Sequence, residues 1–145
     1  MTSVPGALGP IHHVGFVVRD LDRSRRMYEA LGYRGLAPPI DDDRQDAAIL
    51  FLAREGRQHG EPLVELVEPR SEGSPVYAFS IESRFRIHHL CFAVADIRQA
   101  EAALRAHRVT QVMPAVEAPA IGGSLIAFFH SRETGLFELV QQPTF

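Results

Sequence analysis

The sequence predicts an α+β fold built from two copies of one β-α-β-β-β module. A chain of 145 residues has the length of a single compact domain. The segment IHHVGFVVRDL at residues 11–21 recurs as IHHLCFAVADI at residues 87–97, 76 positions later. The segment ELVEP from Glu65 recurs as ELVQQP from Glu138, 73 positions later. Two repeats in the same order and at nearly the same spacing indicate a duplicated unit of about seventy residues.

Each copy opens with an apolar run of eight residues, rich in Val and Phe, which predicts a strand. Asp20 and Asp96 follow these runs as expected helix N-caps, because a short carboxylate accepts backbone N–H groups of a first turn. Apolar spacing then predicts one buried stripe per helix, formed by Leu21, Met27, Tyr28 and Leu31 in the first copy and by Ile97, Ala100 and Leu104 in the second. Gly32 is expected to end the first helix.

Three more strands are expected in each copy, over residues 33–37, 47–53 and 62–67, and over residues 110–116, 124–130 and 136–141. The Asp-rich segment 38–46 is expected to be irregular, and residues 74–81 to form a short helical turn. This gives a flexible lead at residues 1–10 and a single domain at residues 11–142. The domain divides into module one (about 11–70), a linker (about 71–86) and module two (about 87–142).

Composition and charge exclude several classes of partner. Fifteen basic residues against eighteen acidic ones give a net charge of −3, which argues against nucleic acid or an anionic membrane surface. Cys91 is the only cysteine, so no intrachain disulfide is expected. No apolar run is long enough to span a membrane, and the lead has no basic segment followed by an apolar one. We therefore expect a cytoplasmic protein that binds a small molecule.

Strand alternation places the two recurring histidines on faces lined by small residues. Residues of equal parity share a face, so His13 lies with Gly15, and His89 lies with Cys91. The other face of each strand carries bulky residues and is expected to pack under the helix. Small residues beside a histidine leave space for something other than a side chain, which is typical of a pocket floor.

The last strand of each copy carries a carboxylate in apolar surroundings. Glu65 lies between Val64 and Leu66, and Glu138 occupies the equivalent position in the second copy. A buried carboxylate loses several kcal/mol of solvation unless something compensates its charge. A divalent metal would do so, because two His and two carboxylates form a credible ligand set. The alternative is that the duplication copied a structural His–Glu ion pair.

The two IHH openings and the ELVEP and FELVQ endings resemble the vicinal oxygen chelate superfamily, over residues 11–142. The resemblance implies that the two modules pair into a curled, mixed β-sheet with the helices outside. It also implies that His13, Glu65, His89 and Glu138 hold one divalent ion, which could be Co, Ni, Mn, Zn or Fe. Members of the superfamily often form homodimers, and we expect the same here.

The segments IAFFHSRETGLFELV and SPVYAF resemble the methylmalonyl-CoA epimerase branch of this superfamily. That resemblance implies an isomerase that stabilises an enolate, acting on an acyl-CoA thioester or an α-oxo compound. It implies Glu138 as one catalytic base, with Asp43 and Asp46 as candidates for the other. Arg44 stands where the branch has a glutamate, and residues 84–86 replace the usual glycines. A lyase like glyoxalase I, and an antibiotic-binding or resistance protein, are the alternative functions.

Overall fold

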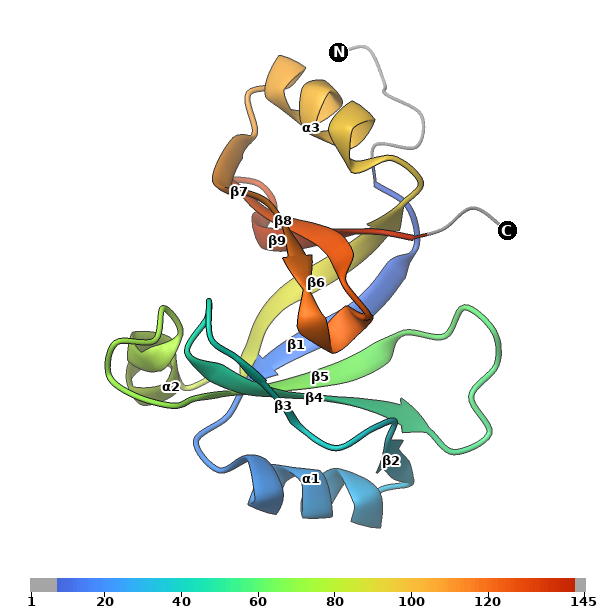
Figure 1. The fold of residues 1–145 in the computed structure, drawn as a ribbon, viewed down its shortest axis with the longest axis vertical. Coiled ribbons are helices and arrows are strands. Elements are labelled where there is room, and N and C mark those ends of the chain that lie inside the picture. The colour runs from blue at the N-terminus through green and yellow to red at the C-terminus, as the bar shows by residue number, and fades with distance from the viewer. Residues whose placement is uncertain (1–7, 143–145) are drawn as a thin grey trace. The chain divides into compact units, whose positions relative to one another are not determined.

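A computed structural model describes residues 8–142 of the chain (Figure 1). The chain forms two compact units. We call residues 13–88 the first unit, and residues 8–12 together with 89–142 the second unit. Most of the predicted lead, residues 1–7, lies outside the described residues. No helix within residues 8–142 has both the length and the apolar character needed to cross a lipid bilayer.

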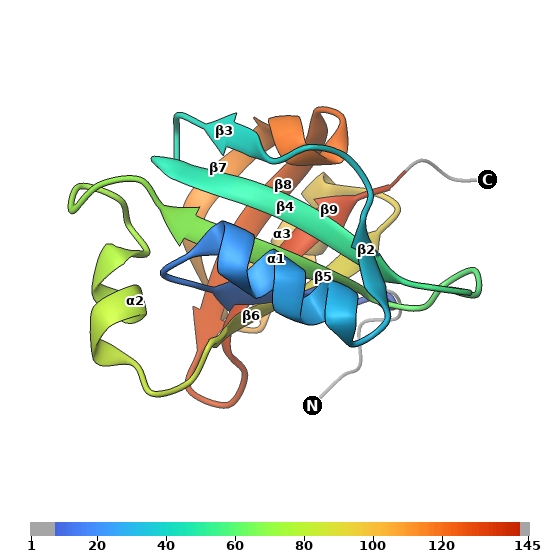
Figure 2. The same cartoon turned by 90° about the horizontal axis from the view of Figure 1, so that it is seen from below.

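The first unit is a mixed sheet with a helix packed on one face. Its elements are β1 (Ile11–Val17), whose first two residues belong to the second unit, α1 (Leu21–Ala30), β2 (Tyr33–Gly35), β3 (Ile40–Asp42), β4 (Ala47–Arg54), β5 (Leu63–Pro69) and α2 (Tyr77–Glu82). β1 runs parallel to β5, β4 runs antiparallel to β5, and β2 and β3 both pair antiparallel with β4. Figure 2 shows α1 lying across β5 and β4. The core under α1 consists of Val18, Leu21, Leu50, Leu52, Val64 and Leu66.

The second unit repeats this arrangement. Its elements are β6 (Ile87–Val94), α3 (Ile97–Ala106), β7 (Thr110–Ala118), the 3₁₀ turn η1 (Pro119–Ile121), β8 (Ser124–Ser131) and β9 (Gly135–Gln141). β6 runs parallel to β9, β8 pairs antiparallel with β9, and β7 pairs antiparallel with β8. The predicted fold class is therefore confirmed, and the first half of the chain adds one short strand, β3, to the β-α-β-β-β module.

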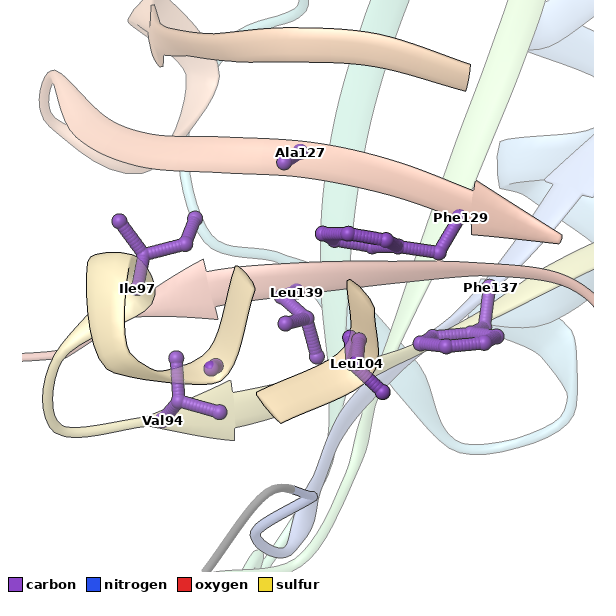
Figure 3. Close-up of a cluster of buried hydrophobic side chains, with 8 residues drawn as sticks. Val94, Ile97, Leu104, Ala127, Phe129, Phe137 and Leu139 are labelled. Carbon is purple, nitrogen blue, oxygen red and sulfur yellow. The ribbon is translucent and has the colours of Figure 1, made fainter. Parts of the chain in front are cut away.

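The core of the second unit lies between α3 and one face of its sheet (Figure 3). Phe129 and Phe137, from neighbouring strands, stack with ring centroids 5.6 Å apart. The cluster consists of Val94, Ile97, Ala100, Leu104, Ala127, Phe129, Phe137 and Leu139. Every apolar residue of the predicted α3 stripe belongs to it, so this part of the helix prediction is confirmed.

Helices α1 and α3 begin where the sequence predicts. The Asp20 carboxylate accepts the backbone N–H of Arg23 at 2.9 Å, and the Asp96 carboxylate accepts the N–H groups of the second and third residues of α3. Gly32 follows α1 with φ of 98°, a left-handed conformation that glycine adopts without a Cβ clash. The short helix predicted within residues 74–81 is present as α2.

Two of the four apolar residues predicted to form the buried stripe of α1 are exposed. Met27 and Leu31 are 61% and 70% exposed, whereas Leu21 is buried and Tyr28 packs against the core. At 100° per residue, Tyr28 lies almost directly above Leu21, while Met27 and Leu31 lie about 120° and 80° to one side. Burial raises the pKa of the Tyr28 phenol, with a smaller contribution from Tyr33.

The Asp-rich segment is more ordered than predicted. Residues 40–42 form β3, and the buried Asp42 carboxylate accepts the backbone N–H groups of Arg44 at 3.0 Å and Gln45 at 3.4 Å. It also accepts the Gln45 side-chain amide at 3.1 Å. Asp42 therefore organises the turn that leads into β4, which a charge run alone does not reveal.

We expect Gly9→Ala to destabilise the second unit. A Cβ at Gly9 would lie 2.0 Å from the carbonyl oxygen of Ala93, and the neighbouring Pro10 oxygen accepts the Ala93 N–H at 2.8 Å. The backbone must move to relieve this clash, at a cost of about 1–3 kcal/mol. Chemical denaturation measures the loss. Gly35→Ala is the control, because its Cβ would make only ordinary contacts, and an equal loss in both variants would contradict the prediction.

Candidate metal centre

The first unit brings together one predicted histidine and one predicted glutamate. β1 and β5 are neighbouring parallel strands, and Gly15 is the register partner of Glu65. His13 lies two residues before Gly15 and so shares the face of Glu65. His13 Nε2 lies 3.6 Å from Glu65 Oε1, and the two residues are 0% and 5% exposed. Strand parity in the sequence relates His13 to Gly15, and the register of β1 with β5 adds Glu65 to the same face.

The second unit builds the same pair in the same way. Cys91 on β6 is the register partner of Glu138 on β9, and His89 lies two residues before Cys91. His89 Nε2 lies 4.0 Å from Glu138 Oε1, and the residues are 5% and 2% exposed. Each unit thus holds one buried imidazole beside one buried carboxylate. The small residue that is the register partner of each glutamate, Gly15 or Cys91, also has the same position in both units.

An aromatic ring borders each pair, and sequence reasoning did not single it out. Phe51 on β4 meets the His13 ring edge to face, with ring centroids 5.0 Å apart. Phe128 on β8 meets the His89 ring in the same manner at 5.2 Å. Phe51 and Phe128 are the register partners of Glu65 and Glu138. The 77-residue offset between these phenylalanines, close to that of the histidines, was the available signal. Each ring gives its His–Glu pair an apolar boundary that restricts the positions the side chains can adopt.

The donor set of each unit fits a divalent metal ion. Two donors held by one ion at about 2.1 Å lie roughly 3–3.5 Å apart, so the observed separations of 3.6 and 4.0 Å would have to shorten slightly around an ion. A direct N–H···O hydrogen bond would be shorter, at about 2.7–3.2 Å. The separations of 3.6 and 4.0 Å are also within ion-pair range, so the His–Glu ion pair stays an alternative to shared ligation. Imidazole and carboxylate together suit several first-row metals.

The structure places Asp43 and Asp46, the other predicted catalytic residues, in the turn between β3 and β4. Asp43 is exposed, and its carboxylate pairs with Arg70 at 3.1 Å. Asp46 has φ of 45° and accepts the hydroxyl hydrogen of Ser71. The turn thus carries carboxylates with cationic or hydroxyl partners. Their roles in catalysis remain predictions.

Comparison with known proteins identifies related sequences. Residues 12–128 match the profile of a family described as the Glyoxalase/Bleomycin resistance protein/Dioxygenase superfamily. The chain is 27% identical, over 129 residues, to the ethylmalonyl-CoA/methylmalonyl-CoA epimerase of Cereibacter sphaeroides, and the match covers 87% of this chain and 91% of that protein. It is 26% identical to the mitochondrial methylmalonyl-CoA epimerase of Bos taurus, with 97% of this chain and 82% of the relative covered.

Solved structures of similar fold carry the same names. The methylmalonyl-CoA epimerase of Mycobacterium tuberculosis aligns with a TM-score of 0.83 at 26% identity, covering 99% of this chain and 93% of that one. A methylmalonyl-CoA epimerase in complex with methylmalonyl-CoA and NH4+ aligns with a TM-score of 0.81 at 26% identity, covering 93% and 95%. The two structural alignments extend over nearly the whole chain, whereas the family profile covers residues 12–128, which contain His13, Glu65 and His89.

Proposed function

The chain belongs to the glyoxalase/bleomycin resistance protein/dioxygenase superfamily, and from this membership we propose that it is a metal-dependent epimerase of an acyl-CoA thioester. The observation that carries the proposal is the pair of buried His–Glu sites, one in each repeat, with matching register and matching aromatic neighbours. The names of the similar proteins support the reaction type and the substrate class.

We propose that His13, Glu65, His89 and Glu138 together hold one divalent ion, which is Co, Ni, Mn, Zn or Fe. Two imidazoles and two carboxylates would leave the site nearly neutral, which removes the penalty of burying two carboxylates alone. A bound divalent ion supplies Lewis-acid stabilisation of the negative charge that develops when an α-proton leaves a thioester.

The protein's own groups must then move that proton. Epimerisation requires a base to remove the α-proton from one face of the carbon and an acid to return a proton to the other. The C–H electron pair moves toward the thioester carbonyl in the first step and returns to carbon in the second. We propose Glu138 as the group at one face, and Asp43 or Asp46 as the group at the other.

The experiment that tests this function is solvent-deuterium exchange into methylmalonyl-CoA, followed by NMR or mass spectrometry. The metal-loaded enzyme should exchange the α-proton and interconvert the two epimers. Removing the metal with a chelator should abolish both reactions, and adding it back should restore them. Persistent absence of exchange by the metal-loaded enzyme, with thioesters and α-oxo compounds alike, would overturn the proposal. Exchange with α-oxo compounds alone would favour a lyase.

The roles of the two aspartates are tested by Asp43→Asn and Asp46→Asn. Replacing the carboxylate that transfers the proton should slow exchange by about 10²–10⁴-fold, because the amide cannot accept a proton. The other replacement should have little effect on the rate. Full activity in both variants would remove this turn from the mechanism. A melting curve for each variant separates a catalytic loss from an unfolded turn.

We further propose that the protein acts in the cytoplasm as a homodimer. Its solution mass, measured by light scattering, should then be twice the chain mass of 16.1 kDa.

A further inference from the structure

Each strand that carries a buried glutamate is tied, three residues later, to the start of a helix. Glu68 on β5 accepts the backbone N–H of Leu21, the first residue of α1, through its Oε2 at 2.6 Å. Gln141 on β9 accepts the backbone N–H of Ile97, the first residue of α3, through its Oε1 at 3.0 Å. The same hydrogen bond therefore occurs in both units. It lies outside the His–Glu pairs described above.

The hydrogen bonds of Glu68 and Gln141 lie at the end of the parallel strand pairing, at the same position in each repeat. In the first unit the Val18 N–H donates to the Val67 oxygen at 2.9 Å, and Glu68 is the next residue of β5. In the second unit Val94 is the register partner of Gln141, and its oxygen accepts the Gln142 N–H at 2.9 Å. After Val18 in the first unit and Val94 in the second, the backbone leaves the strand and turns into α1 or α3. The side-chain bond thus extends the connection between the two parallel strands past the end of the backbone ladder.

The tied strands are those whose relative position sets the His–Glu distances. His13 is on β1, which leads into α1, and Glu65 is on β5, three residues before Glu68. Three residues of a strand span about 10 Å, so Glu68 is a nearby anchor for the strand of Glu65. A shift of β5 along β1 would change the separation of the imidazole and the carboxylate directly. The first N–H of a helix has no partner within the helix, so it is available for this anchor.

We propose, on the basis of the proposed metal function, that Glu68 and Gln141 are positioning residues for the two halves of the metal centre. Neither side chain serves as a metal ligand. Glu68 holds β5, the strand of Glu65, against the start of α1, which follows the strand of His13. Gln141 holds β9, the strand of Glu138, against the start of α3, which follows the strand of His89. One repeat uses a carboxylate and the other an amide for the same hydrogen bond. The bond therefore requires a side-chain acceptor oxygen at the correct distance, and it does not require a negative charge.

The chain offers matched controls for this proposal. Asp20 and Asp96 also accept N–H groups in the first turns of α1 and α3, but each lies directly before its helix rather than on a ligand-bearing strand. Asp20→Ala and Glu68→Ala therefore each remove a cap from the same helix, and only the second also frees β5. Glu68→Gln retains the acceptor oxygen and copies the residue used in the second unit.

The test is the dissociation constant for Co²⁺, measured on the full chain by competition with a chromophoric chelator at 25 °C. We expect Glu68→Ala to weaken Co²⁺ binding about tenfold, the scale on which supporting groups of metal sites act. Glu68→Gln and Asp20→Ala should stay within about twofold of wild type. Gln141→Ala should behave like Glu68→Ala, with Asp96→Ala as its control, and it keeps the proposal testable if one variant does not fold.

A second readout separates this proposal from the proposed metal function. Amide hydrogen exchange of residues 63–67 in the metal-free protein should be faster in Glu68→Ala and unchanged in Asp20→Ala. Equal Co²⁺ affinity in Glu68→Ala and wild type, or equal exchange in Glu68→Ala and Asp20→Ala, would overturn the positioning role. If wild type binds no Co²⁺, the metal function fails and the positioning role toward a metal fails with it. The exchange result then decides only whether Glu68 anchors β5.

Discussion

Glu138→Gln is expected to lose most of its metal affinity while remaining folded. The substitution keeps the shape of the side chain but replaces an anionic ligand with a neutral amide. At a metal concentration 100 times the wild-type dissociation constant, binding stabilises the folded protein by about 2.7 kcal/mol. A variant whose affinity is a hundredfold weaker would retain only about 0.4 kcal/mol of that stabilisation. The melting temperature with metal should therefore fall.

The same variant distinguishes a ligand from a structural ion-pair partner. Without metal, Glu138→Gln removes a buried negative charge, so the metal-free variant should be at least as stable as metal-free wild type. If Glu138 instead forms a structural ion pair with His89, the variant should lose stability in chelator as well. Glu101→Gln is the matched control. Glu101 is also buried, but its carboxylate is held by Arg98 and Gln111 at 2.9 and 3.0 Å, so the metal-dependent gain should be unchanged.

Phe129→Ala is expected to cause the largest loss of stability. Its ring is almost fully buried in the second unit and stacks on Phe137 (Figure 3). Truncating such a side chain costs about 3–5 kcal/mol, from lost transfer energy and from the cavity left behind. For a chain of this size that corresponds to a decrease in melting temperature on the order of 10 °C.

Phe85→Ala is the control for this experiment. Phe85 is 76% exposed, so the same truncation creates no cavity and should change stability by less than roughly 0.5 kcal/mol. Urea unfolding of both variants measures the difference. A loss below about 1 kcal/mol for Phe129→Ala, or equal losses in the two variants, would contradict the packing described for this core.

The sequence was most informative where the repeat supplied two independent copies of one signal. Asp20 and Asp96 cap their helices as predicted because capping depends on residues adjacent in the chain. The sequence also singled out the histidine and the glutamate of each unit, but their pairing depends on the register of two parallel strands, which strand parity alone does not give.

Features that depend on tertiary packing were harder to predict. Met27 and Leu31 are apolar but lie beside the buried face of α1. Apolar spacing in the sequence therefore overestimated how many residues of this helix are buried. The 3₁₀ turn at Pro119–Ile121 and the strand at Ile40–Asp42 are each three residues long, too short to show a periodic pattern. The helix-anchoring bonds of Glu68 and Gln141 left only one trace in the sequence, their matching places in ELVEP and ELVQQP.

The central claim is that His13, Glu65, His89 and Glu138 form one divalent-metal site. The most direct test is elemental analysis of the purified, untagged protein beside a His13→Ala, Glu138→Ala double variant. The account predicts about one divalent ion per chain in wild type and loss of that ion in the folded double variant. Absence of metal from wild type, even after reconstitution, or equal metal in both proteins, would contradict it.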